Sequence, residues 1–249
     1  MTKRIAVAGK GGVGKTTFCA LIIRQLLKHN LKPILAVDAD PNSNLGDLLN
    51  IKYDTTIADI RDTIKENKNL PPNMAKSDYV DMKLNEIISE GEGIDFIAMG
   101  RPEGKECYCY INELLRGFLS RITKQYAVTI VDNEAGMEHL SRRTTDNVDA
   151  LFIVTDPTVV SINSAKKVHE TAKGLKLKIE KTYLVLNRAK KNADAASILK
   201  SAPIELIGTL PYEETIISKS ENGEPLSGLS ETDPYLLELE KILKNSGIV

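Results

Sequence analysis

Short, nearly continuous apolar runs constrain the fold of this chain more than any other feature of its sequence. They alternate with longer amphipathic segments, and we predict strands at residues 4–9, 33–40, 94–100, 127–136, 150–157, 181–188 and 204–211. Runs without strict polar alternation are typical of strands buried on both faces, as in a parallel sheet covered by helices. The repetition of strand, helix and strand predicts an α/β fold with a doubly wound, mostly parallel sheet. A ligand of such a sheet is expected at the carboxyl ends of the strands.

The segments between the runs are consistent with a single domain over residues 1–249. Helices are predicted at 15–30 and 111–125, and a C-terminal helix is expected to begin with Thr232 as its N-cap. Residues at about 52–93 are rich in charge and depart from the rhythm of strands and helices. We interpret them as helices and a loop inserted on the sheet, not as a second domain.

Composition argues against several classes of protein. The formal net charge is −1, so there is no electrostatic reason to expect nucleic acid as the main partner. No apolar run approaches the roughly 20 residues that span a membrane, and a glycine-rich stretch interrupts the apolar N-terminus, which argues against a signal peptide. Three cysteines are too few for a disulfide framework. We expect a reduced, cytoplasmic protein without a membrane partner.

The stretch GKGGVGKTT, from Gly9 to Thr17, fits G-x-x-x-x-G-K-[ST] between a predicted strand and a predicted helix. Glycines there let backbone N–H groups curve around phosphates, and the helix N-terminus adds partial positive charge. Lys15 is expected to reach the β- and γ-phosphates, and the Thr16 hydroxyl to bind Mg²⁺. We therefore predict that ATP or ADP, with Mg²⁺, binds at Gly11, Gly12, Val13, Gly14, Lys15, Thr16 and Thr17.

Carboxylates follow two of the predicted strands. Asp38 and Asp40 lie on the same side of an extended segment, so both are able to point at the phosphates. Asp132 ends a later strand, where a carboxylate commonly holds Mg²⁺, often through water. A lone Asp after a strand is usually a loop or cap residue, but two such strand ends beside a phosphate loop favour the metal site.

The nucleotide base is predicted from one strand end. Asn187 ends the run 181–188, and an Asn amide is able to pair with N6 and N7 of adenine. A guanine-reading N-K-x-D motif is absent because NRAK contains no Asp. The alternative role for Asn187 is a helix cap.

The form KGGVGKT, with Lys10 as a second lysine, resembles the deviant Walker A motif of the MinD, ParA and nitrogenase iron-protein superfamily. The resemblance implies that Lys10 reaches the phosphates of a partner subunit across a nucleotide-sandwich dimer. It also implies that Asp40 positions the attacking water and that Asp38 lies near the Mg²⁺ shell. Pro211 and Tyr212 match a segment that closes over the base in that family.

Cys107 and Cys109 stand one residue apart before a predicted helix. A helix N-terminus lowers the pKa of a thiol, and thiolates bind soft or borderline metals. Two ligands do not complete a tetrahedral site, but two chains on a two-fold axis would supply four sulfurs. The alternative is a pair of inert thiols, whereas Cys19 lies in the apolar pattern of helix 15–30 and is expected in the core.

The stretches GRPEGKECYCYINELLR (100–116) and VDNEAGMEHLSRR (131–143) resemble those of CooC-type nickel-insertion ATPases. The resemblance to these ATPases covers essentially the whole chain. These are maturation factors for carbon monoxide dehydrogenase and acetyl-CoA synthase. The resemblance implies a homodimeric ATPase that forms ADP and phosphate, with one Ni²⁺, or Zn²⁺ in its place, bound by the C-x-C pairs of two subunits. The client would be a nickel-containing carbon monoxide dehydrogenase or acetyl-CoA synthase.

Two alternatives remain open. The first is an iron-protein-like redox partner, whose second cysteine follows the Walker B strand, where VDNEAG has none. The second is a MinD- or ParA-like positioning ATPase, which needs a basic amphipathic C-terminal helix or a basic surface. Here Glu238 and Glu240 stand against Lys241 and Lys244, so the C-terminal helix is poorly suited to anionic lipid.

Overall fold

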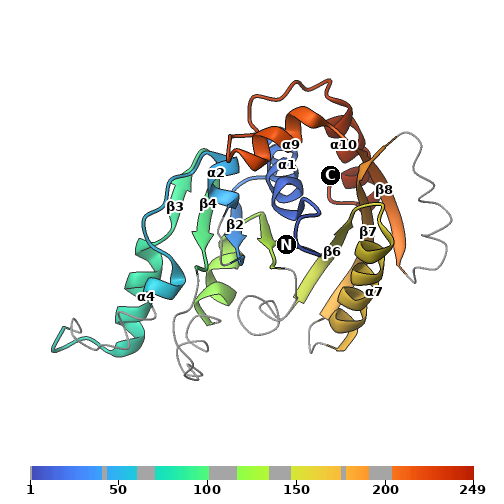
Figure 1. The fold of residues 1–249 in the computed structure, drawn as a ribbon. Helices are drawn as coiled ribbons and strands as arrows, with labels where there is room; N and C mark the ends of the chain where they lie inside the picture. The colour runs from blue at the N-terminus through green and yellow to red at the C-terminus, as the bar shows by residue number, and fades with distance from the viewer. Residues whose placement is uncertain are drawn as a thin grey trace.

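The structure, a computed structural model, describes residues 2–40, 44–60, 71–100, 117–134, 147–174, 178–190 and 204–249 (Figure 1). Its sheet has eight strands in the order β3-β4-β2-β5-β1-β6-β7-β8, and every pairing is parallel except that of β3 with β4. The doubly wound, mostly parallel sheet predicted from the sequence is therefore confirmed. The strands are β1 (Lys3–Gly9), β2 (Ile34–Asp38), β3 (Ser89–Gly91), β4 (Ile94–Ala98), β5 (Val128–Asp132), β6 (Asn147–Thr155), β7 (Lys178–Ala189) and β8 (Glu205–Pro211).

Helices cover both faces of the sheet, with α1, α9 and α10 on one side and α4 and α7 on the other (Figure 1). On the first side, Phe18 of α1 meets Phe152 of β6 edge to face, with ring centroids 5.6 Å apart. Because the sheet is apolar on both faces, two separate cores form, which matches the nearly continuous apolar runs in the sequence. The helices are α1 (Lys15–Lys28), α2 (Leu45–Leu49), α4 (Lys76–Glu86), α7 (Val159–Gly174), α9 (Glu214–Glu221) and α10 (Pro234–Ser246), with a 3₁₀ turn η1 (Thr123–Gln125).

The register of the central strands places their carboxyl ends at one edge. β5 lies between β1 and β2, and Asp132 at its end is level with Val7 and Asp38. Gly9 ends β1 two residues beyond Val7 and leads directly into the glycine-rich stretch. The start of α1 and the carboxylates of two neighbouring strands are thus brought together at the same edge.

The charged segment predicted at 52–93 begins with helical residues at 57–60 and contains two elements that lie wholly among the described residues. α4 packs Tyr79, Val80 and Leu84 against the sheet, and β3 pairs antiparallel with β4 at the edge. The sequence did not indicate β3, because it is short and its residues are partly or fully exposed. An exposed edge strand has no apolar pattern to reveal it.

The predicted N-cap of the C-terminal helix is wrong by one residue. Asp233 is the N-cap of α10, and its side chain accepts a hydrogen bond from the backbone N–H of Tyr235 at 2.9 Å. Pro234 occupies the first helical position, where its missing N–H costs nothing, and this fixes the cap at the residue before it. The Thr232 hydroxyl instead lies 2.8 Å from that of Ser230.

One glycine of β8 provides a test of the packing between the sheet and α10. A Cβ on Gly208 would lie 2.8 Å from Cδ1 of Ile242, and closer still to Cγ1, in a fully buried side chain. Gly208→Ala is expected to lower the free energy of unfolding by about 1–3 kcal/mol through overpacking, measured by urea denaturation. Gly228→Ala is the matched control, because a Cβ there meets no atom within 4 Å. If the two variants are equally stable, α10 does not press on β8 as described.

Candidate functional site

The glycine-rich stretch forms a tight loop between β1 and α1. Gly12 and Gly14 have φ angles of 82° and 90°, which residues with a side chain rarely adopt. Gly14 is the N-cap of α1, in the left-handed conformation. Lys15 is buried, and its Nζ donates to the carbonyl oxygen of Lys10 at 3.4 Å. Lys10 itself is exposed at the mouth of the loop. The two lysines of the motif therefore have opposite environments.

A cavity of about 570 Å³ opens over this loop. Its size falls within the range of about 300–1,000 Å³ that is usual for ligand pockets. Phosphate-loop residues line one side, and Asp40 and the end of α9 line the others. Of the residues predicted from the sequence, the cavity is lined by Gly11, Gly12, Gly14, Lys15, Thr16, Thr17 and Asp40.

The carboxylate of Asp132 is fully buried, and among the described residues neither of its oxygens has a hydrogen bond of full geometry, although the Thr16 hydroxyl and the Cys19 thiol lie close to it. Burial raises its pKa to about 6, although the nearby Thr16 hydroxyl and Lys15 ammonium oppose the rise. Buried oxygens of this kind usually have a hydrogen-bond partner or a bound ion. Mg²⁺ fits that need, because it is commonly held by one or two carboxylates together with substrate phosphates.

The neighbouring carboxylate of Asp38 is engaged by the backbone. Its Oδ1 accepts from the N–H of Asp40 at 3.0 Å, and its Oδ2 accepts from the N–H of Leu45, the first residue of α2, at 2.9 Å. Burial and the charge of Asp132 raise the pKa of Asp38 to about 7, against the effect of these two bonds. Asp38 thus shapes the turn that carries Asp40, and a direct contact with metal would compete with its hydrogen bonds.

The structure places Asn187 against the phosphate loop. Its Nδ2 donates to the carbonyl oxygen of Val13 at 2.8 Å, and its Oδ1 accepts from the N–H of Arg188 at 2.9 Å. Both ends of the amide therefore bond to backbone, and pairing with adenine would require these bonds to break. This placement also explains why a Cβ on Gly14 would meet Asn187 Nδ2 at 2.6 Å.

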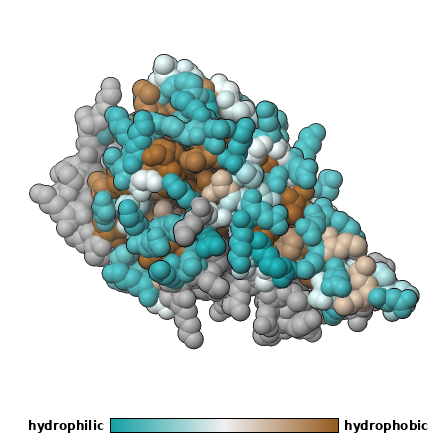
Figure 2. Space-filling view, turned by 180° about the vertical axis from the view of Figure 1, so that it is seen from behind, coloured by the Kyte–Doolittle hydropathy of each residue, from teal (hydrophilic) through white to brown (hydrophobic). Residues whose placement is uncertain are grey.

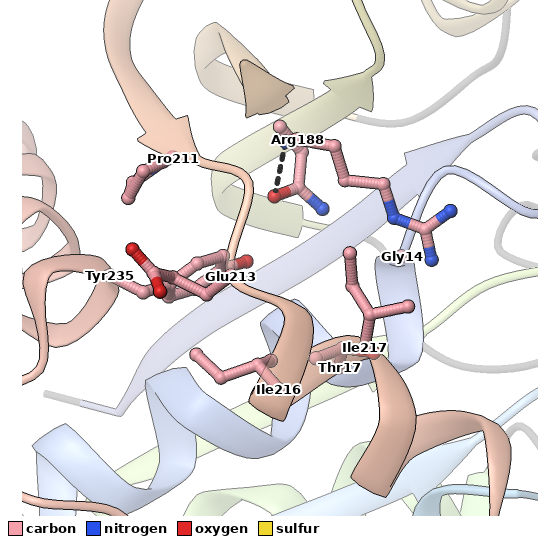
Figure 3. A pocket seen from close by; sticks show the side chains of 9 residues that line it. Gly14, Thr17, Arg188, Pro211, Glu213, Ile216, Ile217 and Tyr235 are labelled. Carbon is pink, nitrogen blue, oxygen red and sulfur yellow. Dashed lines mark hydrogen bonds between the residues drawn. The ribbon is translucent and has the colours of Figure 1, made fainter. Parts of the chain in front are cut away.

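Beside Asn187 lies a second, small cavity, which Figure 3 shows from close by. Pro211 lines it together with Glu213 and Tyr235, whereas Tyr212 is 42% exposed and lies beneath Lys190 Nζ, 5.2 Å from its ring centroid. The cavity measures about 10 Å³, which is room for about one water molecule. A base is therefore too large for this cavity in the conformation described.

Sequence reasoning missed several residues at the site. Ser220 of α9 lies with its hydroxyl 2.6 Å from that of Thr17, which ties the phosphate-loop helix to α9 across the chain. The residues 220–223 line the large cavity, as do Asn44, Asp47 and Arg188. The turn-forming letters ENG at 221–223 mark a loop, but they give no indication of where that loop packs. Arg188 could have been noticed as the neighbour of Asn187.

Cys107 and Cys109 lie outside the described residues. Within the described ranges, no group of three or more His, Cys, Asp or Glu side chains is placed to hold a metal ion. Cys19 is fully buried in α1, as predicted from its place in the apolar pattern. In the same part of the chain, no helix is long and apolar enough to cross a membrane, and the face in Figure 2 mixes hydrophilic residues with apolar patches.

The raised pKa of Asp132 gives a testable dependence of stability on pH. Because the pKa of about 6 in the folded protein exceeds the ordinary aspartate pKa of 3.8, folding favours the protonated form, and stability is lost as the pH rises from the ordinary value toward the folded one. Asp132→Asn removes this cost. We therefore expect the variant to gain stability relative to the wild type as the pH rises. Without Mg²⁺ or nucleotide, the difference in unfolding free energy (variant minus wild type) should be about 1–2 kcal/mol larger at pH 8 than at pH 5.

Chemical denaturation at the two pH values checks this expectation. Glu238→Gln is the control, because it removes an exposed carboxylate of α10 that pairs with Lys241 at the surface. A stability difference that is the same at both pH values would mean that Asp132 is already ionised at pH 5 in the folded protein.

Comparisons with known proteins agree with this geometry. Residues 5–226 match the family described as the CobQ/CobB/MinD/ParA nucleotide binding domain. An uncharacterized ATP-binding protein of Methanocaldococcus jannaschii is 40% identical over 243 residues, covering 96% of each chain. The carbon monoxide dehydrogenase accessory protein CooC of Rhodospirillum rubrum is 28% identical over 233 residues, covering 88% of each.

Among solved structures, the septum site-determining protein MinD of Pyrococcus horikoshii, complexed with Mg-ADP, superposes with a TM-score of 0.68 at 18% identity, covering 97% of this chain and 94% of that one. This likeness shows a shared fold. The family match spans the phosphate loop, Asp40, Asp132 and Asn187. The chain therefore belongs to the CobQ/CobB/MinD/ParA family of nucleotide-binding proteins and is an ATP-binding protein of the P-loop fold.

Proposed function

We propose that this protein is a dimerising, Mg²⁺-dependent ATPase that binds nickel through a shared C-x-C site. It assists nickel insertion into carbon monoxide dehydrogenase or acetyl-CoA synthase. The observation that carries the ATPase part is the contrast between the two loop lysines. Lys15 is buried within its own loop, and Lys10 is exposed at the mouth. An exposed lysine in the phosphate loop would be accessible to the nucleotide of a second subunit.

The roles of the site residues follow from charge. Lys15 in the same chain, and Lys10 from the partner chain, would stabilise the negative charge on the β- and γ-phosphates during transfer to water. Thr16 and Asp132 would hold Mg²⁺, and Asp40, at the cavity wall, would position the attacking water. The products are ADP and phosphate. Hydrolysis should be slow in the monomer, because Lys10 acts only across the dimer.

Features on the same face as Lys10 support a homodimer. Gly9 at the end of β1 is level with Val154 of β6, so Lys10 leaves the sheet close to the residues that lead into α7. Burial acts to raise the pKa of Asp156, but hydrogen bonds from Thr158 and Ser161, together with the positive charge of Lys10, lower it. At the start of α7, Val159 and Val160 are 56% and 63% exposed. Exposed apolar side chains that lie together are a usual component of protein interfaces.

Nickel binding is proposed on the chemistry of Cys107 and Cys109 and on the similarity to CooC of Rhodospirillum rubrum. Two thiolates from each of two chains would form a four-sulfur site suited to Ni²⁺, or to Zn²⁺ in its place. Nucleotide state would set the geometry of the dimer, and the dimer would set how tightly the metal is held.

The C-terminal helix argues against a MinD-like membrane anchor. The apolar side of α10 is buried in the core next to β8, through Leu236, Leu239 and Leu243. Its outer side carries ion pairs of Lys241 with Glu238 and of Lys244 with Glu240. A helix that binds lipid with its apolar face would have to leave the fold.

The role of Lys10 in the partner subunit is tested by Lys10→Ala. We expect ATP hydrolysis to fall by about 100-fold or more, because a charge aimed at the transferred phosphoryl group is lost. ATP-driven dimerisation, followed by light scattering, is expected to disappear while nucleotide still binds. Lys241→Ala on α10 is the matched control. Normal hydrolysis by Lys10→Ala would show that Lys10 plays no part in the chemistry.

The metal site is tested by titrating the apo protein with Ni²⁺ and Zn²⁺ while following oligomer mass. We expect one metal per two chains and a metal-dependent dimer, both lost in the Cys107→Ser/Cys109→Ser double variant. Metal binding that survives this change would place the metal elsewhere. If no thiol-dependent binding occurs, the ATPase remains and nickel insertion is excluded as its role.

A further inference from the structure

The large cavity and the small base-side cavity share three lining residues, which are Gly14, Thr17 and Arg188. The large cavity is lined by Lys15 and Thr16. In the proposed function, Lys15 binds the β- and γ-phosphates and Thr16 binds Mg²⁺. The small cavity is lined by Pro211, which is expected to lie near the base. The three shared residues therefore lie where a bound nucleotide passes from nucleoside to phosphates. Gly14 and Thr17 belong to the phosphate loop, whereas Arg188 has no assigned role.

The backbone of Arg188 is strained. Its φ is 56°, in the left-handed region, and the register between β7 and β8 shifts between Leu186 and Ala189. A residue other than glycine costs about 1 kcal/mol or more in this conformation. The conformation is held by Asn187, whose Oδ1 accepts from the Arg188 N–H. Strain of this kind is concentrated at ligand sites.

The Arg188 side chain extends toward Gly14 and away from Tyr235 (Figure 3). Its Nε is buried and has no hydrogen-bond partner among the described residues, and a Cβ on Gly14 would lie 3.9 Å from this atom. Throughout the described ranges, no carboxylate forms an ion pair with Arg188. A guanidinium with an unused buried donor is well suited to bind a phosphate.

We propose that Arg188 binds the α-phosphate of the nucleotide. This inference rests on the proposed nucleotide site. The loop amides cradle the α- and β-phosphates, and Lys15 reaches the β- and γ-phosphates. A cation that shares its position with Gly14 and Thr17 therefore lies at the nucleoside end of the phosphate chain. Because ATP, ADP and AMP all have an α-phosphate, Arg188 would contribute to the binding of all three nucleotides. It would also determine the position of the nucleoside relative to the phosphate loop.

The experiment compares adenosine, AMP and ADP as ligands of wild type, Arg188→Gln and Arg188→Lys. Saturation-transfer NMR measures the weak ligands, and calorimetry measures ADP with Mg²⁺. For Arg188→Gln we expect about tenfold to hundredfold weaker binding of AMP and ADP, as for loss of a charge-assisted hydrogen bond. Adenosine binding should change less than about twofold, and Arg188→Lys should retain part of the affinity because it keeps the charge.

Arg121→Gln is the matched control, because Arg121 is exposed and pairs with Asp81, outside both cavities. Melting temperatures without nucleotide show whether each variant is folded. An equal loss for adenosine would assign Arg188 to the nucleoside, and a loss for ADP alone would assign it to the β-phosphate. Either result, or no loss, overturns the proposal. If the wild type binds no nucleotide, the proposed function fails instead.

Discussion

The parallel pairing of β5 between β1 and β2 is the constraint on which the rest of the site depends. It brings Asp132 level with Asp38, and it brings the end of β1 to the same edge. Two carboxylates are thereby buried side by side, and burial raises the pKa of each. The fold accepts this electrostatic cost at one edge, where a divalent cation and phosphates would offset it. Stability and ligand binding are therefore opposed at these positions.

The sequence was sufficient for most of the fold because its strands are buried on both faces. Continuous apolar runs are easily recognised in a sequence, and each of the predicted runs corresponds to a strand of the sheet. The phosphate loop was equally visible, since its spacing reflects a local mechanism that needs no tertiary information. The ends of helices were predicted less accurately than the strands. The N-cap of α10 is Asp233 and not the predicted Thr232, because Pro234 occupies the first helical position.

The remaining features depend on contacts between distant segments. Nothing in the local sequence indicates that Ser220 would meet Thr17, about two hundred residues away in the chain. Asn187 was expected to face a base, yet its amide bonds to Val13 and Arg188. The left-handed backbone conformation of Arg188 could not be predicted from the sequence, because this conformation is usually adopted by Gly or Asn and not by Arg. Edge strand β3 lacks an apolar pattern altogether.

The unequal size of the two cavities has a kinetic consequence. The phosphate side is open, whereas the base side holds about 10 Å³. A nucleotide is therefore expected to arrive phosphates first, in a fast and salt-sensitive encounter with the lysines. A slower rearrangement of α9 would follow, as Ile216 and Ile217 give way to the base. Release of the nucleotide would require the same steps in reverse.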